Sequence, residues 1–266
     1  MSDRVRVTID GGVADVRLNR PDKLNALDGA MFLAIAAAGE QLKVDPSVRA
    51  VVLSGEGRGF CAGLDLDFFQ QMATGAIDDA AGNPGRMYDS GLTHLGQQTA
   101  WVWQELTVPV IAAVHGVALG GGLQVALGAD LRIVAPDARL SVMEIRWGLV
   151  PDMTGSYQLG RLVRPDVAKE LCLTGRMVNG EEAVRIGLAT RVSADPRGDA
   201  LALAHDIAGR NPDAVRGIKT LIDGAAGREP VAQFAEERRV VAALIGSANQ
   251  IEAVTAHFEQ RAPVYH

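Results

Sequence analysis

The sequence predicts an α/β fold followed by an entirely helical C-terminal part, and two observations support this. Short apolar segments are each followed by a glycine-rich turn and then by a segment with helical periodicity, a succession that favours strands layered against helices. From about Asp199 onward, only helical patterns occur. We therefore expect an α/β core over 1–195 and a helical region over 196–266.

The first half of the predicted core begins with a β-hairpin. Residues 5–9 and 13–18 alternate apolar and polar side chains around the turn sequence DGG. Asp28 is expected to cap a helix that runs to about Val44, because aspartate is a preferred N-cap residue. The segment RAVVLSG (49–55) is solidly apolar, as in a strand buried on both faces.

The same order of elements recurs further along the chain. A glycine-rich turn, GEGRGFCAG, leads into a helix opened by Asp65. The elements expected after it are a mobile loop over 74–91, a helix over 92–106, a strand over 110–114, a glycine turn with a helix, strands over 131–135 and 138–142, and tail helices separated by breaks at 210–213, 227–230 and 246–249.

Composition and charge exclude several classes of partner. The chain has 266 residues, 48% of them hydrophobic, and a net charge of −6 with dispersed basic residues, so no patch indicates nucleic-acid binding. Its apolar runs are interrupted and too short for a bilayer, and the N-terminus lacks a signal-peptide core. The two cysteines form no disulfide framework. These features predict a cytoplasmic protein without a membrane partner.

Motif spacing excludes several enzyme classes. GEGRGFCAG departs from the dinucleotide-binding spacing, and neither a lysine-ended phosphate loop nor a G-x-S-x-G elbow is present. The five histidines have no metal-ligand spacing, so no metal site is expected.

Two glycine turns remain, FCAGLDL (60–66) and ALGGGLQ (118–124), and each follows an apolar strand and precedes a helix. Bare backbone at the positive end of a helix presents N–H groups to an anion. Two such turns side by side would direct two N–H groups at one oxygen and form an oxyanion hole. The alternative is that these glycines only permit close packing of strand and helix.

Four segments together resemble the crotonase family, also called enoyl-CoA hydratase/isomerase: NRPDKLNALD (19–28), GFCAGLDL (59–66), VHGVALGGGLQVALGAD (114–130) and EIRWGLVPDMTGSYQL (144–159). The resemblance implies a spiral of β-β-α repeats with a C-terminal helical region that assembles trimers or dimers of trimers. It implies an acyl-CoA thioester substrate, with no cofactor beyond the coenzyme A of that substrate.

The resemblance also assigns residues. The thioester oxygen is expected between the N–H groups of Leu64 and Gly121. Coenzyme A is expected near a second set, namely Lys23, Leu24, Ala62, Asp65 and Leu66.

The carboxylates decide between reactions. Hydratases of this family resemble one another in using two glutamates to hold water; here the first position is Gln124, which cannot take a proton, and the second is Glu144. Asp152 resembles the carboxylate of dienoyl-CoA isomerases, although those enzymes also have an aspartate where this chain has Gln124. We therefore expect proton transfer that shifts a double bond, with Glu144 and Asp152 as acid and base and only weak hydration.

Alternatives remain at this stage. One is an enoyl-CoA hydratase in which Glu144 acts while Gln124 positions water, and another is a non-catalytic acyl-CoA-binding member. Asp152 could instead cap a helix that begins near Met153. Other conspicuous side chains are expected to be structural: Asp65 as a helix cap, Cys61 as packing, His94, His115, and Trp101, Trp103 and Trp147 in the core or an interface.

Overall fold

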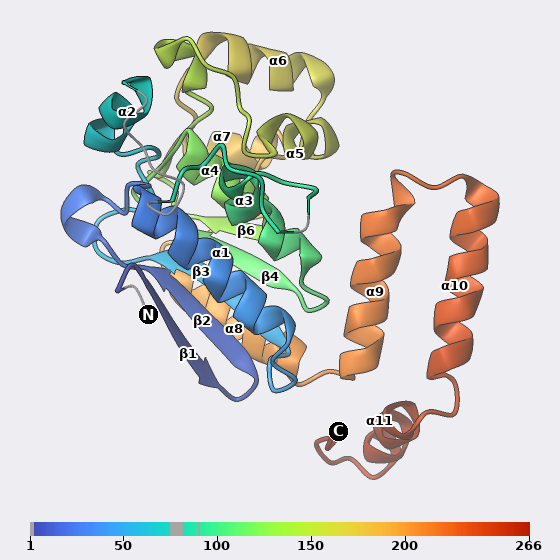
Figure 1. The fold of residues 1–266 in the computed structure, drawn as a ribbon. Helices are drawn as coiled ribbons and strands as arrows, with labels where there is room; N and C mark the ends of the chain where they lie inside the picture. The colour runs from blue at the N-terminus through green and yellow to red at the C-terminus, as the bar shows by residue number, and fades with distance from the viewer. Residues whose placement is uncertain (1–2, 75–81, 90) are drawn as a thin grey trace.

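The computed structural model describes residues 3–74, 82–89 and 91–266. A six-stranded sheet has the order β1-β2-β3-β4-β6-β8, in which β1 and β2 are antiparallel and all other neighbours are parallel (Figure 1). Its strands are β1 (Val5–Asp10), β2 (Val13–Leu18), β3 (Ala50–Gly55), β4 (Val110–Val114), β6 (Leu131–Val134) and β8 (Arg191–Val192). The α/β prediction is confirmed, and β1 and β2 form the expected hairpin.

Helices cover both faces of this sheet and continue to the C-terminus. They are α1 (Gly29–Lys43), α2 (Leu66–Ala73), α3 (Leu95–Glu105), α4 (Gly121–Leu127), α5 (Gly155–Leu162), α6 (Pro165–Thr174), α7 (Gly180–Arg185), α8 (Pro196–Ala208), α9 (Pro212–Ala225), α10 (Pro230–Leu244) and α11 (Ala248–Phe258). Among the described residues, η1 (Pro21–Lys23) and η3 (Glu144–Trp147) are short 3-10 helices. The loop expected over 74–91 lies partly outside the described residues.

A second, smaller sheet explains the β-β-α order. It contains β5 (Val117–Leu119) and β7 (Arg139–Ser141), which run parallel. Cys61 joins it through a parallel bridge to Ala118. Each repeat thus sends one strand to the large sheet and the next to the small one before a helix begins. The sequence did not separate β5 from the glycine turn, because three residues are too short to show a period.

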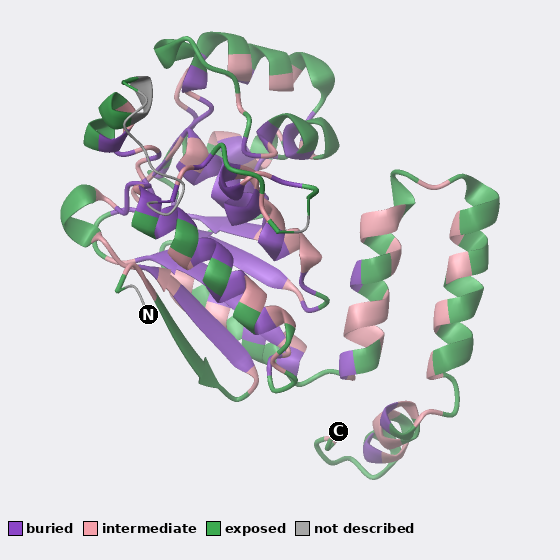
Figure 2. Ribbon diagram, in the orientation of Figure 1, coloured by how far each residue is buried: buried purple, intermediate pink, exposed green. Residues whose placement is uncertain are grey.

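The inner strand β3 is buried on both faces of the large sheet, which explains its apolar run over residues 50–53. Successive side chains of a strand point to opposite faces. Val51 and Leu53 belong to the core shared with α1 and α3, whereas Ala50 and Val52 pack with alanines of α8 on the other face. Figure 2 shows the strands β3 and β4 as buried in full, and β2 is buried except at the half-buried Arg17.

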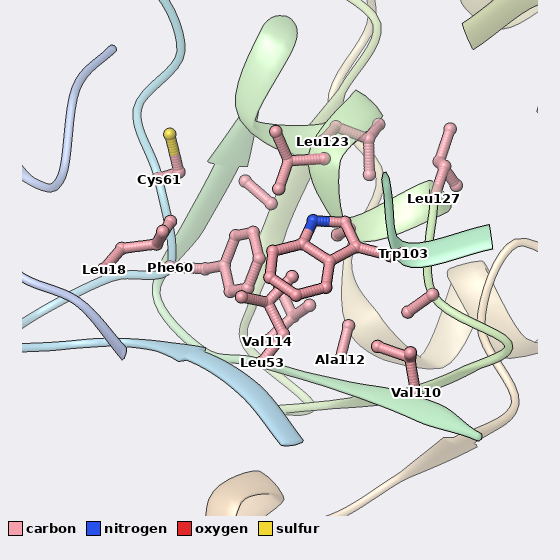
Figure 3. Packing of buried hydrophobic residues seen from close by; sticks show 14 of the residues in the cluster. Leu18, Leu53, Phe60, Cys61, Trp103, Val110, Ala112, Val114, Leu123 and Leu127 are labelled. Atoms are coloured by element: carbon pink, nitrogen blue, oxygen red, sulfur yellow. The ribbon is translucent and has the colours of Figure 1, made fainter. Parts of the chain in front are cut away.

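Trp103 lies at the centre of the larger core. Figure 3 shows its indole ring among Leu53, Phe60, Val114 and Leu123, so α3, α4 and two strands meet on one side chain. Trp103 is fully buried, as expected for a structural tryptophan.

Side chains at the expected positions cap the helices around the cavity described below. Asp28 accepts a hydrogen bond from the N–H of Met31 at 2.8 Å. Asp65 accepts from the N–H groups of Asp67 and Phe68 at 2.9 and 3.2 Å. His94 caps α3 in a capping box with Gln97. The cap predictions for Asp28 and Asp65 and the structural interpretation of His94 agree with this geometry.

The chain leaves the core after α8 rather than before it. α8 packs against the sheet through Ala200, Ala204 and Ala208, so residues placed in the tail by the sequence belong to the core packing. Helices α9 to α11, which we call the helical arm (212–258), stand apart from the sheet in Figure 1. No helix of the described residues is long and apolar enough to cross a membrane.

Candidate active site

A cavity of about 510 Å³ opens beside the two glycine turns and η3. Its size is within the range of small-molecule sites. It brings together most of the predicted site residues: Lys23, Ala62, Leu64, Asp65, Leu66, Gly121, Gln124, Glu144 and Asp152 line it. Leu24 does not line the cavity; its carbonyl oxygen accepts a hydrogen bond from the N–H of Ala62 at 2.9 Å.

The small sheet sets the two glycine turns side by side. Cys61 and Ala118 are paired in parallel, and three residues further along each chain segment are Leu64 and Gly121. Both residues line the cavity. Among the described residues, neither N–H group donates a hydrogen bond within the protein: the parallel bridge between Leu27 and Leu64 uses the N–H groups of Leu27 and Asp65, and Gly121 is the first residue of α4. Two unpaired amides therefore border one cavity.

Steric limits explain the glycines in these turns. Gly63 has φ +86°, and a Cβ there would lie 2.5 Å from the carbonyl oxygen of Leu119. A Cβ at Gly122 would lie 2.5 Å from the carbonyl oxygen of Cys61, so this glycine serves close packing. A Cβ at Gly121 would lie 2.8 Å from the Sδ of Met153, on the cavity side. Close packing and access to the main-chain amides thus both explain why these turns contain glycine.

Glu144 opens η3 and lines the cavity, although its residue is only 8% exposed. Its Oε1 accepts a hydrogen bond from the side chain of Gln124, whereas its buried Oε2 has no partner among the described residues. Burial raises the pKa of the Glu144 carboxyl and the charge of Asp152 raises it further, while hydrogen bonding from the main chain of Glu144 itself and from the Gln124 side chain opposes both. A raised pKa suits a carboxyl group that both takes and gives protons near neutral pH.

Gln124 lies on α4 and is 1% exposed. Its Nε2 donates to Glu144 Oε1 at 2.5 Å, and its Oε1 accepts from the N–H groups of Met153 and Gly155, each at 2.9 Å. The amide oxygen is therefore fully used by the main chain. Pocket-lining by Gln124 agrees with the sequence, but its oxygen is not available to hold water.

Asp152 is exposed and lies on the cavity wall. α5 begins at Gly155 with Thr154 as N-cap, and no side chain caps it. The interpretation of Asp152 as a helix cap is therefore wrong. Thr154 has φ +67°, and this left-handed residue turns the chain between Asp152 and α5.

Asp65 is held by protein groups. Its carboxylate pairs with Arg20 at 2.7 Å and accepts the two amides at the start of α2. Burial alone would raise the pKa of Asp65, but these hydrogen bonds and the Arg20 charge lower it. An ionised, fully engaged Asp65 fixes the turn that carries Leu64.

Asn25, to which sequence patterns assign no role, supports the first glycine turn. The side chain of Asn25 is buried; it donates to the carbonyl oxygens of Glu56, Gly59 and Phe60 and accepts from the N–H of Arg20. Its φ of +56° is a conformation that asparagine tolerates. A polar residue inside the apolar run LNAL was the available signal.

Aromatic side chains also line the cavity, and two of them are in contact. Phe69 of α2 and Trp147 of η3 meet edge to face with ring centroids 5.7 Å apart. Trp147 is 51% exposed, so it is not a core residue. Side chains three residues apart on a 3-10 helix lie on the same face, so Trp147 shares the cavity-facing side of η3 with Glu144. This spacing would have predicted that Trp147 lines the site.

Cys61 is a packing residue, as expected. It is fully buried, and burial raises the pKa of its thiol to about 12. Across 3–74, 82–89 and 91–266, no cluster of three or more His, Cys, Asp or Glu side chains is arranged to hold a metal ion.

Comparisons with known proteins agree with this architecture. The family model described as Enoyl-CoA hydratase/isomerase matches residues 8–266. A probable enoyl-CoA hydratase from Mycobacterium leprae is 34% identical over 263 residues, covering 97% of each chain. A carnitinyl-CoA dehydratase from Proteus mirabilis is 36% identical over 224 residues, covering 83% of this chain and 80% of that protein.

Solved structures agree as well. The structure titled as a putative enoyl-CoA hydratase from Streptomyces coelicolor has a TM-score of 0.89 and 34% identity, covering all of this chain and 95% of that one. A mouse relative, 35% identical over 96% of this chain and 84% of its own length, is named as mitochondrial. The predicted crotonase fold is thus confirmed, and the chain belongs to the enoyl-CoA hydratase/isomerase family of acyl-CoA enzymes.

Proposed function

We propose that this enzyme adds water to, or removes it from, the Cα=Cβ bond of an acyl-CoA thioester, with Glu144 as its acid/base group. The observation that carries the proposal is a buried carboxylate on the same cavity as two main-chain amides, where one carboxylate oxygen and both N–H groups have no hydrogen-bond partner among the described residues. The names of the relatives, hydratase and dehydratase, describe the two directions of this reaction.

The proposed mechanism needs one carboxylate and two amides. Ionised Glu144 takes a proton from water as the water oxygen bonds to Cβ, and the electron pair of the double bond moves to the thioester oxygen. The N–H groups of Leu64 and Gly121 stabilise that negative oxygen, each by about 3–4 kcal/mol in comparable sites. Protonated Glu144 then returns the proton to Cα, and dehydration follows the reverse path.

The double-bond shift favoured by the sequence is our second candidate. It is supported by Asp152, a second carboxylate on the cavity whose charge raises the pKa of Glu144. Gln124 supplies no carboxylate and its oxygen is occupied, so a two-carboxylate mechanism would have to use Asp152.

Two substrates separate the candidates. Wild-type enzyme should hydrate a 2-enoyl-CoA such as crotonyl-CoA, and Glu144→Gln should lower that rate by about 10²–10⁴-fold. Asp152→Asn should leave hydration within a few-fold. Interconversion of 3-enoyl- and 2-enoyl-CoA without hydration, lost in Asp152→Asn, would replace the first candidate by the second.

We also propose that the chain self-associates as a trimer or dimer of trimers through the helical arm. Two points support this: α10 has an exposed apolar face, and the resemblance to the crotonase family implies trimers or dimers of trimers. The cytoplasmic location stays a prediction from the sequence, because a relative of similar identity is named as mitochondrial.

A further inference from the structure

We propose that Gln124 is a positioning residue, which holds the carboxylate of Glu144 and the segment bearing Asp152 in one fixed arrangement. The inference rests on the proposed function only in taking Glu144 as the acid/base group. The contacts of Gln124 itself carry the rest, and they involve both ends of its side-chain amide.

The acceptor end fixes how the amide is oriented. Oε1 accepts from the N–H groups of Met153 and Gly155, each at 2.9 Å. Turning the amide over would place its own N–H₂ against these two donors and leave all of them unsatisfied in a buried site. Gln124 therefore has one allowed orientation, and it holds the main chain directly after Asp152.

The donor end then selects the orientation of Glu144. Nε2 lies 2.5 Å from Glu144 Oε1 and donates to it. Among the described residues Oε2 has no hydrogen-bond partner, so the two carboxylate oxygens differ: Oε1 is held by Gln124 and Oε2 is not held. The Gln124 side chain is 1% exposed and is held by two main-chain donors, so its position is fixed by the protein. The Glu144 carboxylate that it contacts is therefore oriented before substrate binds.

Gly155 is part of this arrangement. A Cβ at position 155 would lie 2.5 Å from Gln124 Oε1 and 2.8 Å from its Cδ. Only a glycine lets the N–H of residue 155 approach the amide oxygen, and a methyl group there would push Gln124 away from Glu144. On the same helix, a Cβ at Gly160 would meet nothing within 4 Å.

The charge of Glu144 reports on Gln124 because, apart from burial and the main chain of Glu144 itself, few groups act on this carboxylate. From the segment before α5, Asp152 acts by repulsion. On α6, burial and the charge of Glu144 raise the pKa of the Cys172 thiol. Arg146 of η3 donates to the carbonyl oxygen of Gly175. Gln124 supplies the side-chain hydrogen bond that favours the ionised form.

The test is the titration of Glu144 in the free, full-length protein. Infrared spectroscopy on protein labelled with carbon-13 at the glutamate carboxyl groups gives it, with the Glu144 signal identified by its loss in Glu144→Gln. Gln124→Met should raise the titration midpoint by about one pH unit, because a hydrogen bond to the charged form is lost. Gly155→Ala should raise it in the same direction.

Matched controls separate positioning from general disturbance. Gln158→Met removes another buried glutamine, and Gly160→Ala adds a methyl group on the same helix; neither should move the midpoint. An unchanged midpoint in Gln124→Met, or equal shifts in the controls, would overturn the proposal. If the midpoint shifts but the wild type acts on no enoyl-CoA, the positioning role stands and the proposed function fails.

A second variant covers the case in which Gln124→Met does not fold. Gln124→Glu keeps the acceptor for Met153 and Gly155 but places a second carboxylate against Glu144. Two carboxylates in contact titrate as a coupled pair with one pKa strongly raised. A protonated carboxyl band persisting at neutral pH supports the contact, and two ordinary titrations would contradict it.

Discussion

At the scale of single residues, Glu144 combines burial with a function that needs its charge. Burial raises its pKa, so the folded protein binds the proton of Glu144 more tightly than the unfolded chain does. The ionised carboxylate therefore destabilises the fold. This cost is absent below the unfolded value of 4.5 and is complete above the raised, folded pKa. The charge that the proposed reaction needs therefore lowers the stability of the folded protein.

Glu144→Gln should accordingly stabilise the protein at pH 8. The variant retains an oxygen that can accept from Gln124, and it removes the buried charge. Each unit by which the pKa is raised corresponds to about 1.4 kcal/mol. Urea unfolding at pH 8 and at pH 5 gives the free energy of unfolding of both proteins. The difference between variant and wild type should be smaller at pH 5. A difference that grows as the pH falls would mean the pKa is depressed instead.

Gly121 tests the oxyanion hole at the same scale. A side chain there meets Met153 Sδ at 2.8 Å and Leu27 Cδ1 at 3.0 Å, beside the free amide. Gly121→Val should lower kcat for an enoyl-CoA by at least about 10²-fold, the usual effect of losing one oxyanion donor. Gly160→Ala is the control, and circular dichroism checks the fold. Wild-type turnover in Gly121→Val would rule out this amide as a donor.

The positions of site residues were predictable from sequence only where a local motif determines them. The motifs predicted one site for Leu64, Gly121 and Glu144, and all three line one cavity, while their catalytic roles stay predictions. The role of Gln124 depends on which groups face it from 29 and 31 residues away, at Met153 and Gly155, and no local pattern contains that. The sequence left the role of Asp152 open for the same reason. Whether it caps α5 depends on where that helix begins, and the left-handed Thr154 moves the start of α5 to Gly155.

At the scale of elements, small residues set how closely α8 approaches the sheet. Ala200, Ala204 and Ala208 recur at four-residue spacing, so they share one face of the helix, and all three are buried. They pack on the second face of the large sheet. The sequence predicted the helix but assigned it to the tail, because alanines give little hydrophobic contrast.

Ala204→Leu should therefore destabilise the protein by about 1–3 kcal/mol through overpacking. Ala202→Leu on the exposed side of α8 is the matched control and should change stability by less than about 0.5 kcal/mol. Urea unfolding measures both. Equal effects of the two substitutions would show that α8 does not pack on the sheet through this face.

At the scale of the whole molecule, the helical arm exposes an apolar face. Val231, Phe234, Val241 and Ile245 are 82%, 56%, 49% and 71% exposed. At about 100° per residue they fall on one side of α10. Val240 lies on the other side, near Gly217 of α9. The arm thus has an inner contact between its helices and an outer surface suited to another copy of the chain.

Phe234→Glu combined with Val241→Glu should reduce the particle mass in light scattering toward 28.1 kDa, the mass of one chain. Ala243→Glu, exposed and off the apolar face, should not. A wild-type mass of one chain at micromolar concentration would contradict self-association. The sequence predicted the arm's helices, whereas their placement beside the core, where Lys219 of α9 pairs with Asp130 at 2.6 Å, depends on tertiary packing that periodicity does not encode.

The most direct test of the account is exchange of the Cα proton of a saturated acyl-CoA in heavy water, which requires no hydration. Enolate formation between the amides of Leu64 and Gly121, with Glu144 as base, predicts incorporation of deuterium by the wild type. The rate should fall by about 10²–10⁴-fold in Glu144→Gln. Absence of exchange in the wild type, or equal rates in both proteins, would contradict the central role given to Glu144.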